Sequence, residues 1–201
     1  MRLSHKLLIV PFAAILFLLV LGAVTIYAMW IERSALVDIY ENRIMHFSIG
    51  SQAAEKVSRV QSNVYRLITK VATYDKQLIN EMSREQLENI DSIVVDFKKA
   101  YTRNDLDKET SSLLEPVMQD LVTYQQDISA TLEAALADSK RGMAVMNQRA
   151  DHSYETLNMN MTTLVLHEFT QARLNYERAV AIFNQAVLIA IAVLAGAVGV
   201  I

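Results

Sequence analysis

The sequence predicts an all-α protein, an antiparallel up-down four-helix bundle flanked by two transmembrane helices. Long apolar runs occupy both ends of the 201-residue chain. The roughly 150 residues between them are rich in Ala, Leu, Glu, Gln and Lys, which favour helices. In this middle part apolar residues recur at alternating steps of three and four, the period of packed helices. Two prolines and five glycines are too few for a turn-rich β protein.

The composition excludes several classes of function. A net charge of −3 creates no basic surface for nucleic acid, so we expect no nucleic-acid partner. The absence of cysteine excludes disulfides, thiolate metal sites and a cysteine nucleophile. The His167-Glu168 pair lacks the second histidine of a zinc protease, because position 171 is Gln171. The sequence also has no glycine-rich phosphate loop and no G-x-S-x-G motif. We therefore expect no metal, no cofactor and no enzymatic activity.

The first apolar run, residues 7–30, predicts a transmembrane helix. It is uncharged and exceeds the ~20 residues that span a bilayer. Basic residues precede it, so residues 1–6 are expected in the cytoplasm and the following segment outside. A cleaved signal peptide is the alternative, but its apolar region is shorter, about 7–15 residues, and Ala28-Met29-Trp30 is a poor cleavage site.

The second apolar run predicts another transmembrane helix at residues 181–201. Only Asn184 and Gln185 are polar, near its outer end. A terminal carboxylate after Ile201 would lie in hydrocarbon, where a charge costs at least about 3 kcal/mol. We therefore expect a longer protein in which this span is truncated here. Residues 31–180 are expected to form a domain outside the cytoplasm.

The apolar seams predict where the helices of this domain lie. The first helix continues from the membrane span at residue 31 to residue 74 or 78. The second starts at Ser83, where Gln86 completes a capping box, and ends at the polar turn 103–105. The third starts at residues 112–116, near Pro116. The fourth runs from residue 143, after a break at 138–142, into the second span.

The seams of the first and fourth helices have the alternating spacing of coiled-coil contacts, and the other two also recur at steps of three or four. The first comprises Val57, Val60, Val64, Leu67 and Val71; the second Leu87, Ile90, Val94, Phe97 and Tyr101; the third Val117, Leu121, Tyr124, Ile128, Leu132 and Leu136; the fourth Val165, Phe169, Ala172, Tyr176, Ala179 and Phe183. The first and fourth helices outreach the other two and would form a two-helix stalk near the membrane. Because such a stalk buries little apolar surface, we expect a homodimer.

This plan resembles the sensor half of a bacterial methyl-accepting chemotaxis protein with a four-helix-bundle ligand-binding domain. The segment Asn63-Val64-Tyr65-Arg66-Leu67-Ile68 is similar to an x-x-l-Y-R-L stretch common in one branch of these domains. The passage from the third to the fourth helix is also similar, at Tyr124, Asp127-Ile128, Ala137-Asp138, Ala144, Met146 and Ala150. The resemblance covers the whole chain.

The resemblance implies a multi-pass chemoreceptor of the bacterial inner membrane with a periplasmic sensor domain. Its ligand would be a small organic acid or amino acid, bound directly or delivered by a periplasmic binding protein. Cytoplasmic signalling partners would act through a part beyond residue 201. The same module also occurs on histidine kinases and diguanylate cyclases, which is one alternative. A ligand-free structural membrane coiled coil is the other.

A polar stripe on the first helix is the candidate ligand site. Arg59, Asn63, Arg66 and Lys70 follow i, i+4, i+7 and i+11, which places them on one face. A guanidinium holds a carboxylate through two hydrogen bonds, and Arg66 is the strongest candidate because it lies in the Tyr-Arg-Leu stretch. The resemblance implies that polar groups at the start of the fourth helix complete the site. The predicted ligand-binding residues are Arg59, Asn63, Arg66, Lys70, Arg149 and His152. The alternative is a solvated face whose cations pair with acids on neighbouring helices.

Overall fold

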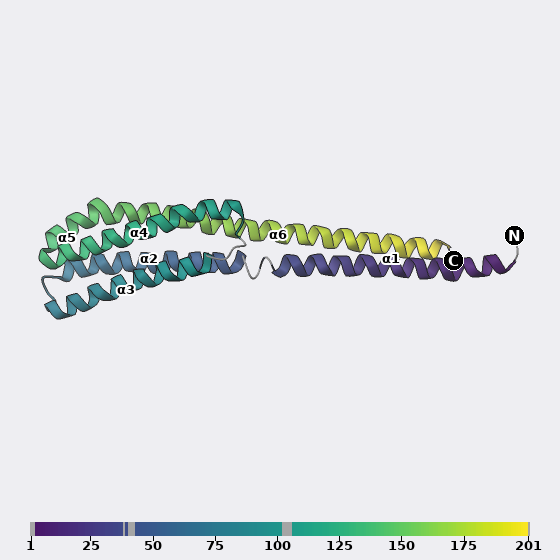
Figure 1. The fold of residues 1–201 in the computed structure, drawn as a ribbon, viewed down its shortest axis with the longest axis horizontal. Helices are drawn as coiled ribbons and strands as arrows, with labels where there is room; N and C mark the ends of the chain where they lie inside the picture. Colours follow the sequence, from purple (N-terminus) through teal and green to yellow (C-terminus); the bar gives the residue numbers. More distant parts are fainter. Residues whose placement is uncertain (1–2, 38, 40–42, 102–105, 201) are drawn as a thin grey trace. The chain divides into compact units, whose positions relative to one another are not determined.

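The computed structural model describes residues 3–37, 39, 43–101 and 106–200 and is an all-α bundle with long apolar helices at both ends of the chain (Figure 1). The elements are α1 (Leu3–Val37), α2 (Met45–Lys70), α3 (Lys76–Tyr101), α4 (Lys108–Ala137), α5 (Ser139–Val145), the π-helical turn η2 (Met146–Ala150) and α6 (Asp151–Val200). The polar turn predicted at residues 103–105 lies outside the described residues.

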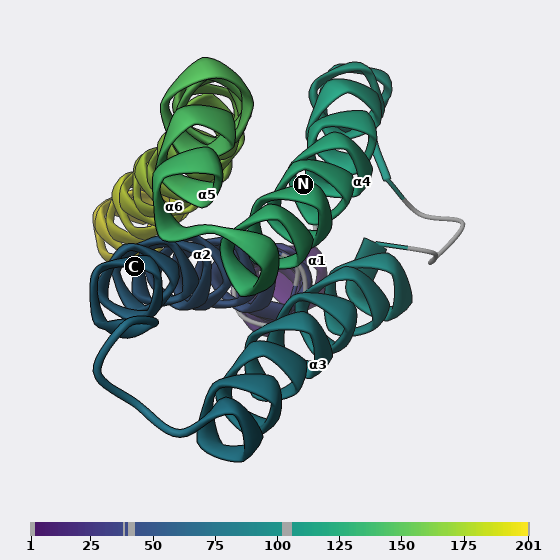
Figure 2. The same ribbon diagram turned by 90° about the vertical axis from the view of Figure 1, so that its left-hand side faces the viewer.

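Packing divides the chain into two units. Ile44–Phe169 forms the four-helix bundle, and Met1–Arg43 with Thr170–Ile201 forms the unit of the two chain ends. In the bundle, α2, α3, α4 and the column made by α5, η2 and the first part of α6 surround one core (Figure 2). The up-down arrangement predicted from the sequence is confirmed.

The predicted seams of the first three helices supply most of this core. Their buried members are Val57, Val60, Val64, Leu67, Ile90, Phe97, Tyr101, Val117, Leu121, Tyr124, Ile128 and Leu132. Val71, Leu87 and Val94 are partly buried against them, while Leu136 is exposed. Fully burying an apolar side chain of this size stabilises a fold by about 1.5–3 kcal/mol, so these seams hold the bundle together.

The turn between α2 and α3 lies earlier in the chain than predicted. α2 ends at Lys70, before the predicted end at residue 74 or 78, and α3 begins before the predicted Ser83. The N–H groups of Thr73 and Tyr74 donate to the carbonyl of Lys70 at 2.9 and 3.1 Å. α3 then begins at Lys76. The predicted start at Ser83 was wrong, because Ser83 and Gln86 are buried inside α3 and face the other helices instead of capping an end.

The starts of the third and fourth helices also differ from the prediction. Asp107 caps α4 through its Oδ1, which accepts the N–H of Thr110 at 2.7 Å, so Pro116 lies inside the helix. Only Asp138, extended at φ −158° and ψ 126°, separates α4 from α5. Gly142 lies within α5 and not in a break. A Cβ there would be 2.5 Å from that of Ala135, so glycine permits the close approach of the two helices.

The seam predicted for the fourth helix was wrong within the bundle. The buried residues of α6 are Ser153, Leu157, Met161, Leu164 and Glu168, while Phe169 is 52% exposed. The inward face is therefore displaced by one position from the predicted one. The reason is that it ends in a carboxylate: Glu168 is fully buried and its Oε1 accepts a hydrogen bond from Thr110 Oγ1 at 2.9 Å. A charged residue at a core position conceals the helical register.

The first helix predicted from residue 31 to residue 74 or 78 corresponds to α1 and α2 where the chain is described, and residues 38 and 40–42 between them lie outside the described residues. α1 ends at Val37 and α2 begins at Met45, with π-helical bonding at Ile39, Arg43 and Ile44 among the described residues of this stretch.

The unit of the two chain ends contains two helical segments long and apolar enough to cross a membrane. They lie within Ile15–Ser34 of α1 and within the Ser139–Gly196 column. In this unit a Cβ on Gly196 would lie 3.9 Å from Phe17 Cε1, which places the two helices side by side. Large apolar side chains such as Phe12, Leu18, Leu188 and Ile191 point outward, as in helices that face lipid.

Candidate functional site

Two of the predicted ligand-binding residues line a groove between α2 and α3. The groove has a volume of about 300 Å³. Its walls are Lys56, Arg59, Val60 and Asn63 from α2, and Gln86, Asn89 and Ser92 from α3. Two cations, three amides and a hydroxyl therefore surround it, and none of these lining residues is acidic. This donor set suits a small anion.

The two cations of the groove have partners that an anion could replace. Lys56 Nζ lies 3.4 Å from Asp96 Oδ2, and Arg59 lies 3.6 Å from Glu55 on its own helix. All four side chains are exposed, and exposed pairs of this kind contribute only about 0–1 kcal/mol. The groove can therefore exchange these contacts for a ligand at little cost.

Arg66 and Lys70 do not line this groove. Arg66 donates a hydrogen bond to Asn63 Oδ1 at 2.8 Å, and Asn63 in turn donates from Nδ2 to Gln86 Oε1 at 3.1 Å. Lys70 lies 5.6 Å from the ring centre of Tyr74. The hydrogen bond between Asn63 and the buried Gln86 closes one end of the groove. Arg66 and Lys70 therefore lie outside the groove that Arg59 and Asn63 line.

Arg149 and His152 line a different hollow, beside α4. Its volume is about 380 Å³, and Asp120, Asp127, Gln148 and Ser153 are among its walls. Arg149 pairs with Asp127 at 2.7 Å, and Asp120 accepts a hydrogen bond from Asn160 at 2.7 Å. The structure therefore does not unite these two residues with the stripe on α2.

Sequence reasoning missed a polar network between α2, α4 and the start of α6. Tyr124 Oη donates to Gln61 Oε1 at 2.9 Å, and Gln61 Nε2 donates to Asp151 Oδ1 at 2.7 Å. Tyr65 Oη donates to Asp151 Oδ2 and approaches Asn147 at 3.5 Å. Asp151 directly follows the π-helical turn η2, and such turns are frequent at functional sites. The available signal was Gln61, four residues after Val57 on the apolar seam.

Burial keeps the phenols of this bundle protonated. Desolvation, then the hydrogen bond to Asp151 and its charge, raise the pKa of Tyr65 to about 12. Burial also raises the pKa of Tyr124, with smaller contributions from Tyr154 and Asp151. Both phenols therefore act as neutral hydrogen-bond donors over the physiological range.

Comparison with known families decides what kind of module this is. Residues 1–183 match the family described as "Four helix bundle sensory module for signal transduction". The chain belongs to this family. No curated protein and no solved structure was found to match it.

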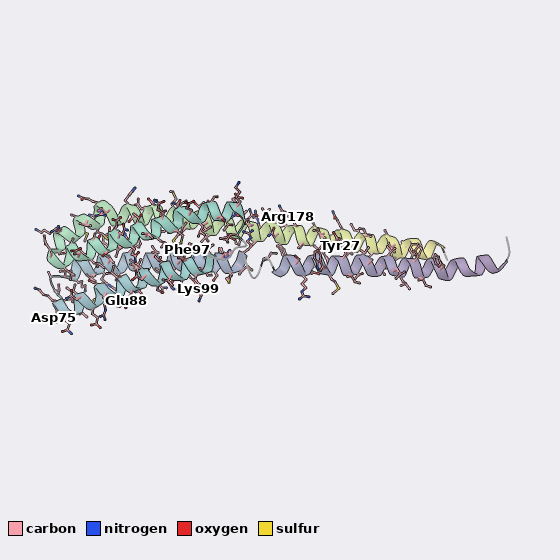
Figure 3. The ribbon with its side chains drawn as sticks, in the orientation of Figure 1. Tyr27, Asp75, Glu88, Phe97, Lys99 and Arg178 are labelled. Atoms are coloured by element: carbon pink, nitrogen blue, oxygen red, sulfur yellow. The ribbon has the colours of Figure 1, made fainter. Side chains whose placement is uncertain are left out.

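The sensory module carries its polar sites between helices. Figure 3 shows Asp75 at one end of the bundle, with Glu88 and then Lys99 farther along it, so α3 extends along the bundle. No group of three or more potential metal ligands occurs among the residues that the structure describes. Family membership indicates a sensory module for signal transduction.

Proposed function

We propose that this sensory module is the receptor part of a bacterial chemoreceptor, with its bundle on the periplasmic side of the inner membrane. It detects a small organic acid or amino acid. Family membership, the two apolar helical segments and the basic N-terminal flank support this proposal. The apolar, outward-pointing side chains of the chain-end unit support a membrane location.

The observation that carries the ligand proposal is the groove formed by Lys56, Arg59, Asn63 and Gln86. An ionised carboxylate needs several donors when it leaves water, and this groove offers two cations with amides around them. Arg66 acts as a positioning residue, because its hydrogen bond to Asn63 Oδ1 directs the amide Nδ2 towards Gln86. The hollow at Arg149 and His152 is the second candidate, with acids that suit the ammonium group of an amino acid.

Signal transmission follows from the continuity of α6. This helix runs from Asp151, bonded to α2, to Val200 without interruption. A ligand shifts an equilibrium between two bundle states only by its different affinity for them. We infer that a ligand between α2 and α3 changes the packing of α2 against α6, and that α6 carries the change towards the membrane.

The full chain in lipid nanodiscs provides the binding test. Calorimetric titration with acetate, succinate, malate and aspartate should identify a binding acid. Arg59→Ala and Lys56→Ala should each weaken its binding about tenfold or more, the worth of a charged hydrogen bond. Arg84→Ala is the matched control, since Arg84 is an exposed cation on α3 outside the groove. If no acid binds, or if the control weakens binding equally, the proposed site is wrong.

A hybrid receptor tests the output. This chain is joined to the signalling part of a known chemoreceptor, and kinase activity is recorded on adding the acid that binds. A response lost in Arg59→Ala supports the proposal. An unchanged kinase activity despite binding would instead favour the alternative that this module belongs to a histidine kinase or a diguanylate cyclase. Absence of both binding and response would favour a structural coiled coil.

A further inference from the structure

A second, more apolar hollow lies between the same two helices. Its volume is about 410 Å³. Its walls are Met45, Ile49, Gln52, Ala53 and Lys56 from α2, and Ile93, Asp96, Phe97, Lys99 and Ala100 from α3. Ile93 and Phe97 are fully buried and Ala53 nearly so, and they form an apolar floor. Lys56 and Lys99 provide cationic groups at the rim.

The two hollows form successive sections of one interhelical groove. Lys56 lines both of them. Along α2 the lining residues recur at steps of one, three or four from Met45 to Asn63, and along α3 their partners run the opposite way from Ala100 to Gln86. This spacing keeps all of them on the facing sides of two antiparallel helices. One end of the groove is polar and cationic, and the other is apolar.

We propose that this composite groove binds an amphipathic monocarboxylate, an alkyl or aryl acid. The carboxylate lies between Lys56 and Arg59, and the hydrocarbon part extends over Ile49, Ala53 and Phe97. This inference rests on the proposed function and specifies its ligand class. Charge complementarity at one end and apolar burial at the other favour a ligand with a single charge at one end.

A second charge at the far end of the ligand would be unfavourable in this groove. It would lie against Ile49 and Phe97, where burial of an unpaired carboxylate is costly. Of the two cations that line the apolar section, Lys56 holds the first carboxylate, so Lys99, exposed at the rim, is left to compensate a second charge. The test therefore compares monocarboxylates with dicarboxylates of equal length.

The experiment titrates the full chain in nanodiscs with butanoate, hexanoate and octanoate, and with adipate and suberate as dicarboxylates of matched length. Affinity should rise by about fourfold for each methylene that becomes buried, and hexanoate should bind at least about tenfold more tightly than adipate. In Ile49→Ser the rise with chain length should become clearly shallower, because one apolar wall residue is lost, while butanoate still binds. Lys56→Gln should weaken the binding of every monocarboxylate in the series.

The possible outcomes separate this inference from the proposed function. A flat chain-length series, or dicarboxylates binding as well as monocarboxylates, overturns the inference. If succinate still binds and depends on Arg59, the proposed function survives that result. If no carboxylate binds, both fail. A chain-length dependence that is undiminished in Ile49→Ser would indicate partition into lipid and would also overturn the inference. Retained butanoate binding by Ile49→Ser shows that this variant is folded.

Discussion

Gln61 Nε2 donates a hydrogen bond to Asp151 Oδ1 at 2.7 Å, which joins the middle of α2 to the first residue of α6. The same amide accepts a hydrogen bond from Tyr124 on α4 through its oxygen at 2.9 Å. The side chain of Gln61 therefore connects three helices of the bundle, α2, α4 and α6. Since Gln61 is buried, both of its polar groups need these partners.

Asp151→Ala should destabilise the bundle by about 1–3 kcal/mol, because it leaves the buried Gln61 amide and the Tyr65 phenol without their acceptor. Urea unfolding of the full chain, followed by circular dichroism, measures this change. Asp91→Ala is the control, since Asp91 accepts an exposed hydrogen bond from Gln125 and takes no part in the buried network. Equal losses of stability in the two variants would contradict the importance of the network.

The stability of the bundle should fall as the pH rises from about 10 to about 12. In the unfolded chain a tyrosine loses its proton near pH 10, whereas the pKa of Tyr65 in the folded protein is about 12. A group whose pKa is raised on folding contributes its stability below the unfolded pKa and loses it through the folded one. Tyr65→Phe should reduce this alkaline slope in denaturant titrations at several pH values. A slope as steep as that of the unsubstituted chain would show that Tyr65 does not contribute to it.

Asp96→Asn should strengthen the binding of a carboxylate in the α2–α3 groove. The substitution removes the acid that lies 3.4 Å from Lys56 and leaves the ammonium for the ligand. An exposed pair is worth up to about 1 kcal/mol, so the Kd for succinate or butanoate should fall by about two- to fivefold. Asp91→Asn removes the same charge elsewhere on α3 and controls for the general field. A larger gain in that control would place the site elsewhere.

Gly142→Ala should destabilise the α4–α5 hairpin by about 1–3 kcal/mol through overpacking. The added Cβ would lie 2.5 Å from the Cβ and 2.7 Å from the Cα of Ala135, and a backbone atom cannot move aside cheaply. Gly22→Ala, with nothing within 4 Å of the new Cβ, should be tolerated. Thermal unfolding of both variants gives the comparison. A Gly142→Ala variant as stable as the unsubstituted chain would contradict this packing.

The sequence predicted the seams of α2, α3 and α4 because their core positions carry residues such as Val64, Phe97 and Ile128, whose spacing alone reveals a buried face. It failed at helix ends. Asp107 caps α4 several residues before the expected start, and polar residues elsewhere in the chain resemble caps equally well. It failed on α6 because Glu168 occupies a core position through its bond to Thr110.

The candidate site was predicted only in part, for a geometric reason. Helical spacing correctly gave Arg59 and Asn63 one common face, but it contains no information about where a neighbouring helix closes that face. The buried Gln86 does so at Asn63, which excludes Arg66 and Lys70 from the groove. The apolar continuation towards Met45 depends on α3 running antiparallel beside α2, which only the folded chain reveals.

The π-helical turn at Met146–Ala150 sets the rotational phase between α5 and α6. Such a turn holds one residue more than a regular α-helical turn. With this extra residue, Gly142 and Met146 face the core on one side of Asp151. Leu157 faces the same core on the other side of Asp151. Deleting one residue within the turn would restore an unbroken α-helix and swing the earlier face by about 100°. Gly142 would then turn away from Ala135. The extra residue therefore keeps the inward face of α5 aligned with the inward face of α6.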